Sequence, residues 1–215
     1  MLETDHIIIS PPQNVATPTK PVGFGFYYMI STDPKLAPSV QKFYTGDDYK
    51  DFDNVGPSPV IIHRKQLEQV VRPWWDMSVR LKLDAEANRV FGWVTEMWGY
   101  SLAAMNLGIR HTVLREFQVE PQGIGTDGMD QYSIYHYTFG LNIQDKAARA
   151  GTWRLDKRQL PGYLPTNIPD PPMCSTESAF FLTNAFNEAS STIPNWPGRQ
   201  HTDADLKRPP QDLPK

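Results

Sequence analysis

Cysteine is almost absent from this chain, because Cys174 is the only one in 215 residues. An internal disulfide framework and a multi-cysteine zinc site are therefore excluded. An excess of basic residues is also missing, since Lys and Arg total 21 whereas Asp and Glu total 24. The net charge of −3 argues against a nucleic-acid partner, which a clustered basic surface would attract.

Long apolar runs are absent as well. The longest one near the start covers residues 7–9, far short of the roughly 20 residues that a bilayer helix needs. Neither a membrane-spanning helix nor a signal peptide is therefore expected. The Gly-Lys-Ser/Thr phosphate loop and the Gly-x-Ser-x-Gly nucleophile elbow are also missing, so neither motif points to a function here.

What the chain does contain is enough for a packed core, because hydrophobic residues make up 40% and charged residues 21%. The pattern mixes strands with helices and predicts the α/β class. Residues 64–71 and 74–83 show helical spacing, and Pro73 is expected to interrupt the helix between them. One or two further helices are expected within residues 84–107, capped by Asp84 or Thr95. The other expected elements are strands at residues 7–9 (buried), 22–30, 58–63, 109–119 and 132–139, and a helix at 176–191 with an apolar stripe of Phe180, Phe181, Ala185 and Ala189.

Two carboxylates open the chain, in the order Glu3-Thr4-Asp5-His6. Side chains two apart on a strand project to the same side, so Glu3 and Asp5 can reach one cation. Oxygen ligands suit a hard divalent ion such as Mg²⁺ or Mn²⁺. A charged turn at a chain terminus explains the same residues without a metal.

A histidine, His136, stands within the largely apolar and aromatic residues 132–140. As a neutral imidazole, His136 would complete the metal site that Glu3 and Asp5 begin. As a core residue, it would only be hydrogen-bonded. Gly140, at the end of this stretch, would let a backbone amide approach an anion closely.

A carboxylate, Glu96, lies among large apolar residues and glycines at 91–100. Burying it is costly unless it has a partner or a task, such as orienting an acceptor hydroxyl or stabilising a cationic sugar centre. A bond to a buried arginine or to the backbone is the structural alternative. Further along, Lys157 and Arg158 could clamp a diphosphate, and a solvated basic turn is the simpler explanation of this pair.

Taken together, these segments resemble the plant and algal hydroxyproline O-arabinosyltransferase family, which is related to the peptidyl serine α-galactosyltransferases. The resemblance runs in order from residue 3 to about residue 196, which makes it far more specific than any single block. The blocks that carry it are residues 3–7 (ETDHI), 58–62 (SPVII), 91–97 (FGWVTEM), 136–140 (HYTFG), 153–158 (WRLDKR), 187–189 (NEA) and 193–196 (IPNW).

The resemblance implies a Golgi glycosyltransferase of GT-A-like fold, with a mixed sheet, flanking helices and a Pro-rich C-terminal tail. Such an enzyme moves a sugar, here L-arabinofuranose, from a UDP-sugar donor to hydroxyproline of a peptide or glycoprotein, with retention. Transfer of galactose to serine is the runner-up. The implied site residues are Glu3, Asp5 and His136 for Mn²⁺ or Mg²⁺, Lys157, Arg158 and Gly140 for the donor, and Glu96 for catalysis.

The resemblance also predicts the organisation of the chain. Residues 1–160 would be the C-terminal portion of the catalytic domain, 161–198 an extension with one helix, and 199–215 a disordered tail. The family's nucleotide-binding half precedes the acidic motif, so we expect either a truncated gene model or a remnant, which binds UDP poorly and lacks full activity, with any membrane anchor upstream. A departure follows His136, where Phe139-Gly140-Leu141-Asn142 replaces the family's Tyr-Gly-Cys-Asp.

Two competing classes stay open. A non-catalytic glycosyltransferase-like module would use its aromatic residues as a platform for peptide or sugar. A metal-dependent hydrolase built on Glu3, Asp5 and His136 would turn over substrate without UDP.

Overall fold

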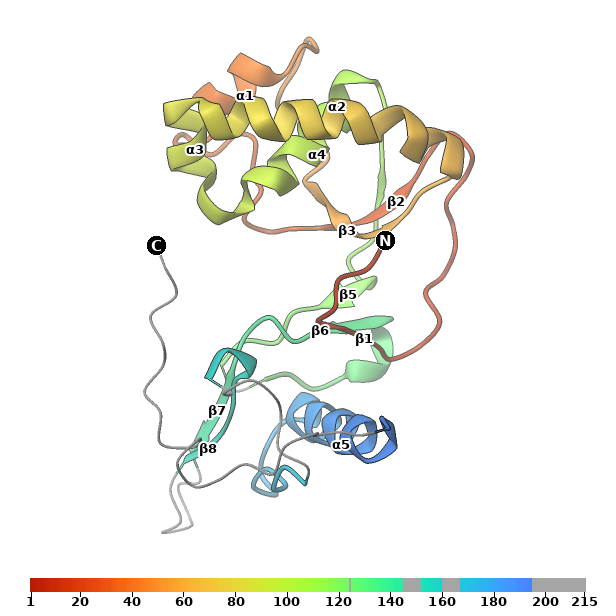
Figure 1. The fold of residues 1–215 in the computed structure, drawn as a ribbon, viewed down its shortest axis with the longest axis vertical. Coiled ribbons are helices and arrows are strands. Elements are labelled where there is room, and N and C mark those ends of the chain that lie inside the picture. The colour runs from red at the N-terminus through yellow and green to blue at the C-terminus, as the bar shows by residue number, and fades with distance from the viewer. Residues whose placement is uncertain (124, 145–151, 160–166, 195–215) are drawn as a thin grey trace. The chain divides into compact units, whose positions relative to one another are not determined.

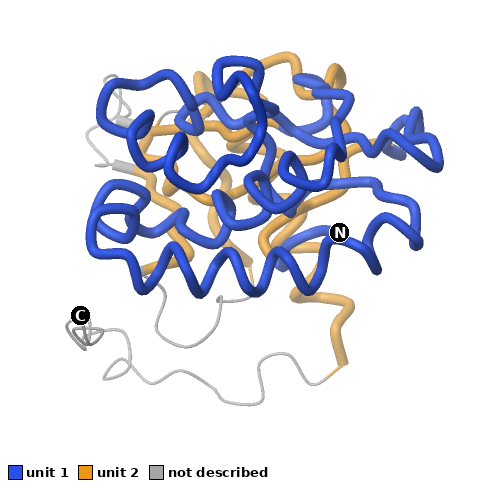
Figure 2. The backbone as a smooth tube through the Cα atoms, turned by 90° about the horizontal axis from the view of Figure 1, so that it is seen from above, with its two compact units in different colours: residues 1–4, 11–118 blue, residues 5–10, 119–215 orange. Residues whose placement is uncertain are grey.

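The structure is a computed structural model that describes residues 1–123, 125–144, 152–159 and 167–194. Its elements form a mixed α/β protein with small sheets (Figure 1), so the predicted class is confirmed. The chain divides into two compact units (Figure 2): the first holds residues 1–4 and 11–118, the second residues 5–10 and those from 119 onward. The domain limits predicted at residues 160 and 198, and the tail from 199, lie outside the described residues.

A small mixed sheet and four α-helices build the first unit. The sheet has the order β3-β2-β4, in which β2 pairs antiparallel with β3 and parallel with β4. The strands predicted here are present but differ in extent from the prediction. The elements are β2 (Val22–Gly25), α1 (Ala37–Phe43), β3 (Val55–Ile61), α2 (Arg64–Leu83), α3 (Ala85–Phe91), the 3-10 turn η1 (Gly92–Val94), α4 (Thr95–Asn106) and β4 (Thr112–Val113).

Helix α2 runs without interruption through Pro73, so the predicted break is wrong. Proline lacks the amide hydrogen that would bond the carbonyl four residues earlier. Packing outweighs this loss, because α2 buries Val70, Met77 and Leu81 in the core of this unit. The indole of Trp74, next to the proline, also donates a 3.0 Å hydrogen bond to the carbonyl of Glu96 in α4.

Two helices, not one, follow α2. Asp84 caps the first, α3, by accepting a hydrogen bond from the amide of Ala87. Of the two caps that the sequence offered, Asp84 and Thr95, Asp84 is therefore confirmed. Gly92 then adopts a φ of 57°, which starts η1 and ends the helix. Thr95 is not a cap, since it lies inside α4, and its hydroxyl donates to the carbonyl of Gly92.

The core of the first unit lies where α2 packs against α4. Trp98 of α4 is buried and stacks on Phe91 with ring centroids 4.8 Å apart. Gly99 permits a close approach of the two helices, because a Cβ there would lie only 3.1 Å from the Cα of Ser78. The α4 helix is buried on nearly every side, which explains its apolar sequence. Within the described residues, no helix combines the length and the apolar character needed to cross a membrane.

The second unit carries two small sheets and one long helix. One sheet has the order β1-β6-β5, and the other is the antiparallel pair β7-β8. The predicted strand at the start is present, but Ile8 is 55% exposed, so its expected burial is wrong. The elements are β1 (His6–Ile8), β5 (Gln118–Val119, at the border between the units), the 3-10 turns η2 (Met129–Gln131) and η3 (Lys157–Gln159), β6 (Ile134–His136), β7 (Leu141–Gln144), β8 (Thr152–Leu155) and α5 (Glu177–Thr192).

Helix α5 confirms the helix predicted at residues 176–191, but it turns a different face to the core. Ala179 and Leu182 are buried with residues of β6, β7 and β8, whereas Phe180 and Phe181 are only half-buried. The predicted aromatic stripe is therefore offset from the face that is buried.

Candidate metal centre

The pairing of β1 with β6 brings the start of the chain beside His136. The two strands are antiparallel, and His6 is the direct partner of His136 in the register. Directly opposed residues point to the same face, and the two imidazole rings meet edge to face with centroids 4.6 Å apart. The amide of Tyr137 bonds the carbonyl of Asp5, so the pairing extends to the residue before β1.

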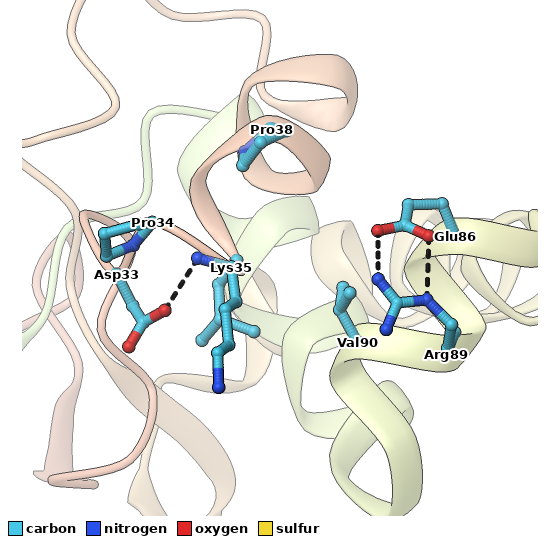
Figure 3. A pocket seen from close by; sticks show the side chains of 8 residues that line it. Asp33, Pro34, Lys35, Pro38, Glu86, Arg89 and Val90 are labelled. Atoms are coloured by element: carbon cyan, nitrogen blue, oxygen red, sulfur yellow. Dashed lines mark hydrogen bonds and ion pairs between the residues drawn. The ribbon is translucent and has the colours of Figure 1, made fainter.

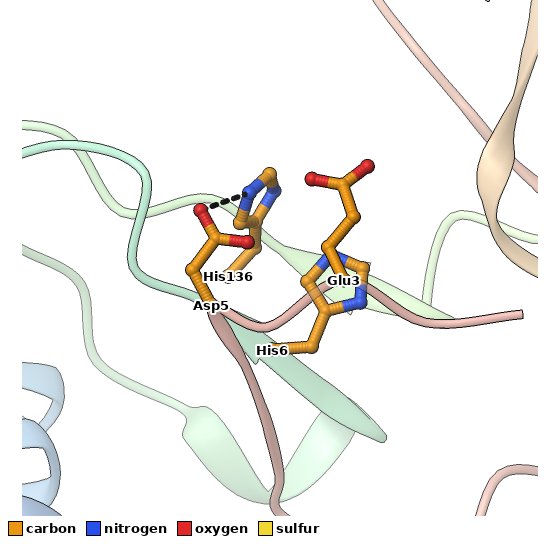
Figure 4. A group of neighbouring side chains, drawn as sticks. All are labelled: Glu3, Asp5, His6 and His136. Carbon is orange, nitrogen blue, oxygen red and sulfur yellow. Dashed lines mark hydrogen bonds and ion pairs between the residues drawn. The ribbon is translucent and has the colours of Figure 1, made fainter.

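Four side chains gather potential metal-binding atoms here (Figure 4). Glu3, Asp5, His6 and His136 each offer one carboxylate oxygen or imidazole nitrogen, and these atoms all lie within 4.8 Å of one another. Asp5, His6 and His136 belong to the second unit, and Glu3 precedes Asp5 by two residues. The structure thus brings together the three ligands predicted from the sequence, while their role in binding metal stays a prediction.

His136 is held between two carboxylates. Its Nε2 lies 3.3 Å from Oδ2 of Asp5, and its Nδ1 lies 2.9 Å from Oε1 of Glu120. An ionised carboxylate only accepts hydrogen bonds, so a ring nitrogen that bonds one carries a proton; a metal at Nε2 would displace the proton there and leave the one on Nδ1 toward Glu120. A carboxylate behind a histidine is the usual arrangement at metal sites, because it orients the ring and makes the other nitrogen more basic.

Two members of this group, His6 and Asp5, have shifted pKa values. Burial lowers the pKa of His6 to about 4, and the neighbouring His136 adds to this effect, so His6 is a neutral imidazole. Burial opposes ionisation of Asp5, but the hydrogen bond from Lys157 and the charge of His136 outweigh it and lower the pKa of Asp5. A carboxylate with two imidazoles is a nitrogen and oxygen donor set that fits Mn²⁺ and related divalent ions.

The three residues predicted to bind the donor lie in two different surroundings. Lys157 donates to Oδ2 of Asp5, and its ammonium lies 4.8 Å from the centre of the Tyr137 ring. Arg158 instead pairs with Asp156, whose Oδ1 accepts from both its Nε and its amide at 3.0 Å.

Gly140 lies against the carboxylate of the same Asp156, because a Cβ at Gly140 would be only 2.7 Å from it. In this structure, therefore, Lys157 joins the metal-binding group, and Arg158 and Gly140 surround Asp156. Their predicted contact with a donor stays untested.

Glu96 does not lie where the sequence suggested. It is in the first turn of α4 in the first unit, and it is exposed instead of enclosed by apolar groups, so that expectation is wrong. The reason is that Met97 and Trp98, its neighbours in α4, take the buried face. Partial desolvation and the negative charge of Glu3 raise the pKa of Glu96.

The sequence prediction missed two residues that lie beside His136, namely His6 and Glu120. His6 was passed over as a ligand because strict alternation along a strand sends it away from Asp5. Asp5, however, lies just outside β1, where the backbone no longer alternates regularly. Glu120 follows β5 and carries no local pattern that points to His136, sixteen residues further along.

Other polar features of the described residues are structural. In the first unit, His111 bonds the hydroxyl of Tyr100 at 2.9 Å and its amide bonds Asp53, and both rings are buried. A pocket of about 680 Å³ in the same unit (Figure 3) is lined on one side by the ion pair of Glu86 with Arg89, both on α3. Neither feature contains a residue of the metal-binding group.

The letters Gly-x-Gly-x-x-Gly occur at residues 123–128. The dinucleotide fingerprint requires a long helix directly after these glycines. Here the segment leads into the 3-10 turn η2, and Gly123, Gly125 and Gly128 all have positive φ. The described residues therefore show a turn at this place, without the helix that a dinucleotide site needs.

Comparison with known proteins agrees with the resemblance. The hydroxyproline O-arabinosyltransferase family N-terminal domain matches residues 1–113, and the C-terminal domain of the same family matches residues 133–197. No solved structure matches this chain.

Three relatives illustrate the range of similarity. Hydroxyproline O-arabinosyltransferase RDN1 of Medicago truncatula is 37% identical over 203 residues, which cover 91% of this chain and 56% of the relative. Hydroxyproline O-arabinosyltransferase 3 of Arabidopsis thaliana is 37% identical over 204 residues, with the same coverage. Peptidyl serine alpha-galactosyltransferase of Arabidopsis thaliana is 28% identical over 188 residues, 80% of this chain and 22% of the relative.

The chain thus spans little more than half the length of the first two relatives. Both domains of the family are matched, in order, and the matched ranges include Glu3, Asp5, His6 and His136. The chain belongs to the hydroxyproline O-arabinosyltransferase family.

Proposed function

We propose that this chain is the metal-binding part of a glycosyltransferase that moves L-arabinofuranose from a UDP-sugar to hydroxyproline in a peptide or glycoprotein, with retention. The observation that carries this proposal is the convergence of Asp5, His6 and His136 in a chain matched by both domains of the family. The GT-A-like fold and the Golgi location are part of the same proposal and come from the family resemblance.

The donor set is suited to a divalent cation. Asp5 contributes an ionised oxygen, and His6 and His136 contribute imidazole nitrogens, with Glu3 two residues away along the chain. A Mn²⁺ or Mg²⁺ ion bound there would neutralise the negative charge that develops on the departing UDP diphosphate. Glu120 would keep the His136 ring oriented through its Nδ1 proton.

The cationic and acidic side chains divide the remaining tasks. Lys157, next to Asp5, is our proposed contact for the donor diphosphate, together with Arg158 and the backbone at Gly140, which both lie beside Asp156. Glu96, exposed on α4, is the proposed carboxylate for the acceptor hydroxyl or the cationic sugar centre. Because Glu96 is exposed, a peptide can reach it without any rearrangement of the helix.

The test is transfer by the 215-residue chain with Mn²⁺ and UDP-L-arabinofuranose to a hydroxyproline peptide, followed by mass spectrometry. A proline peptide of the same sequence lacks the acceptor hydroxyl and is the matched control. We expect an arabinosylated product from the hydroxyproline peptide alone, in low yield because this chain is expected to bind UDP poorly, and no product after chelation or with Asp5→Asn. A serine peptide with UDP-galactose tests the runner-up reaction.

Each contrary result has one meaning. A chain that binds Mn²⁺ but transfers no sugar to either peptide would be the non-catalytic module. Hydrolysis of a substrate that contains no UDP would favour the hydrolase. Transfer that survives both chelation and Asp5→Asn would reject the metal centre.

Glu96 has a separate test. Glu96→Gln keeps the size of the side chain but removes its charge, so turnover should fall while the affinity for the donor is kept. Asp130→Asn, an exposed carboxylate of η2 in the second unit, is the control. Unchanged turnover would show that Glu96 has no part in the reaction.

A further inference from the structure

The Asp5 carboxylate, which the proposed metal centre needs, is bonded to a lysine of this chain. The ammonium of Lys157 donates to Oδ2 of Asp5, the same oxygen that lies 3.3 Å from Nε2 of His136. The Lys157 side chain is 31% exposed and that of Asp5 is 19% exposed. The Lys157 ammonium therefore already contacts the Asp5 oxygen that a metal ion would use as a ligand.

A divalent cation at Oδ2 of Asp5 would compete with this ammonium. Metal–oxygen bonds to Mg²⁺ are about 2.0–2.1 Å long, so an ion bound to that oxygen would lie within a few ångströms of the Lys157 nitrogen. Two positive charges at that separation repel in a partly buried site. A metal bound at Oδ2 therefore favours departure of the lysine from Asp5.

The surroundings of Lys157 allow it to leave. It is the first residue of the short turn η3, and its ammonium lies over the face of Tyr137, which attracts cations on its own. The two neighbouring arginines are held differently, since Arg154 and Arg158 both pair with Asp156. Of the three cations in this turn and strand, Lys157 is the one that contacts Asp5.

We propose that Lys157 is a resident counter-ion of the metal centre, which neutralises Asp5 before metal binds and is displaced by the incoming divalent cation toward the anionic donor. This inference rests on the proposed function, because it takes Asp5 to be a metal ligand and a sugar diphosphate to be the donor. It couples the two binding events: the ammonium becomes available to a diphosphate only after the metal has entered.

A purely structural lysine predicts the opposite sign for one measurement. If Lys157 holds Asp5 in place for the metal, its removal weakens metal binding. If Lys157 competes with the metal, its removal strengthens metal binding. The sign of the change in Mn²⁺ affinity of Lys157→Gln therefore separates the two roles.

The experiment measures binding of Mn²⁺ alone by the full chain, using the electron paramagnetic resonance signal of free Mn²⁺. We expect Lys157→Gln to bind Mn²⁺ about tenfold more tightly than wild type, the size of one charge-assisted contact. Arg154→Gln, which removes the same charge on β8 without touching Asp5, is the matched control and should bind like wild type. Equal or weaker binding by Lys157→Gln would overturn the counter-ion role.

A second measurement needs no variant. Trace acetylation followed by mass spectrometry reports how accessible each lysine is, and Mn²⁺ should increase labelling of Lys157 several-fold. Lys42, paired with Asp84 in the first unit, is the internal control and should not respond. Labelling of Lys157 that Mn²⁺ leaves unchanged would overturn the displacement.

The two failures can be told apart. If wild type and Asp5→Asn show the same lack of Mn²⁺ binding, the metal centre of the proposed function is rejected. If wild type binds Mn²⁺ and Asp5→Asn does not, but Lys157→Gln gains nothing, only the counter-ion role is rejected.

Discussion

The most informative variant of the proposed metal centre is Glu120→Gln. Glu120 touches His136 through the 2.9 Å contact with Nδ1, and its side chain is only 7% exposed. Glutamine has the same shape but no charge, and its amide can turn either its oxygen or its nitrogen toward the ring. The variant therefore removes the negative charge that makes Nε2 of His136 more basic. It also removes the acceptor that fixes the proton on Nδ1.

The expected loss follows from this contact. Replacing the hydrogen-bonding partner behind a metal-bound histidine reduces metal affinity by about 10- to 100-fold, or roughly 1.4–2.7 kcal/mol. We expect the lower half of this range, because Asp5 and His6 remain as ligands in the variant.

The assay is a Mn²⁺ titration of wild type and Glu120→Gln near pH 7, with the nitrogen NMR shifts of His136 as an independent report of its tautomer. Glu188→Gln, an exposed position on α5, is the matched control. A thermal melt of both variants shows whether the fold is retained. If Glu120→Gln binds Mn²⁺ as tightly as wild type and His136 keeps its tautomer, Glu120 does not orient the ring and the reasoning fails.

Three further variants test the packing of the units by chemical denaturation. Asp53→Asn should lower the free energy of unfolding by roughly 2–3 kcal/mol, because Asp53 accepts hydrogen bonds from Arg110 and from the amide of His111. Burial opposes them, yet these bonds lower the folded pKa of Asp53 below 3.8, so its stabilisation is present above that pH and is lost as the pH falls through the folded value. The gap between wild type and variant should therefore shrink in acid, and a constant gap would contradict the argument. Leu81→Ala, fully buried in α2, should cost about 3 kcal/mol, and a loss below 1 kcal/mol would contradict its place in the core. Gly140→Ala should cost about 1–3 kcal/mol, since its Cβ would overlap Asp156; an unchanged midpoint would show that Asp156 can move aside.

Local signals in the sequence predicted α2, α3, α4 and α5 in part, whereas α1 was not expected. The capping by Asp84 follows from residues within one turn of it. The break predicted at Pro73 was wrong because the sequence shows only the cost of one missing hydrogen bond. The burial of Val70, Met77 and Leu81, which offsets this cost, depends on packing against α4. The buried face of α5 was misjudged for the same reason, since the strands that cover it decide which residues are enclosed.

The candidate site was predictable only in part. The pairing of Asp5 with His136 was one of two interpretations of the residues and was favoured by the family resemblance, and the register of β1 with β6 gives it a physical basis. Glu120 could not be found, because its contact with His136 depends on how β5 and β6 lie in one sheet. The exposure of Glu96 depends on which face α4 buries, and the helix is too uniformly apolar for the sequence to show that face.

The path of the chain limits how this protein can be divided. Residues 5–10 belong to the second unit although they are followed by more than a hundred residues of the first. A fragment that begins at Val119 would lack β1, and with it Asp5 and His6, and would leave one edge of β6 unpaired. To obtain the second unit as a separate piece, the first ten residues would have to be grafted onto it, by circular permutation or as an added peptide that restores the missing strand.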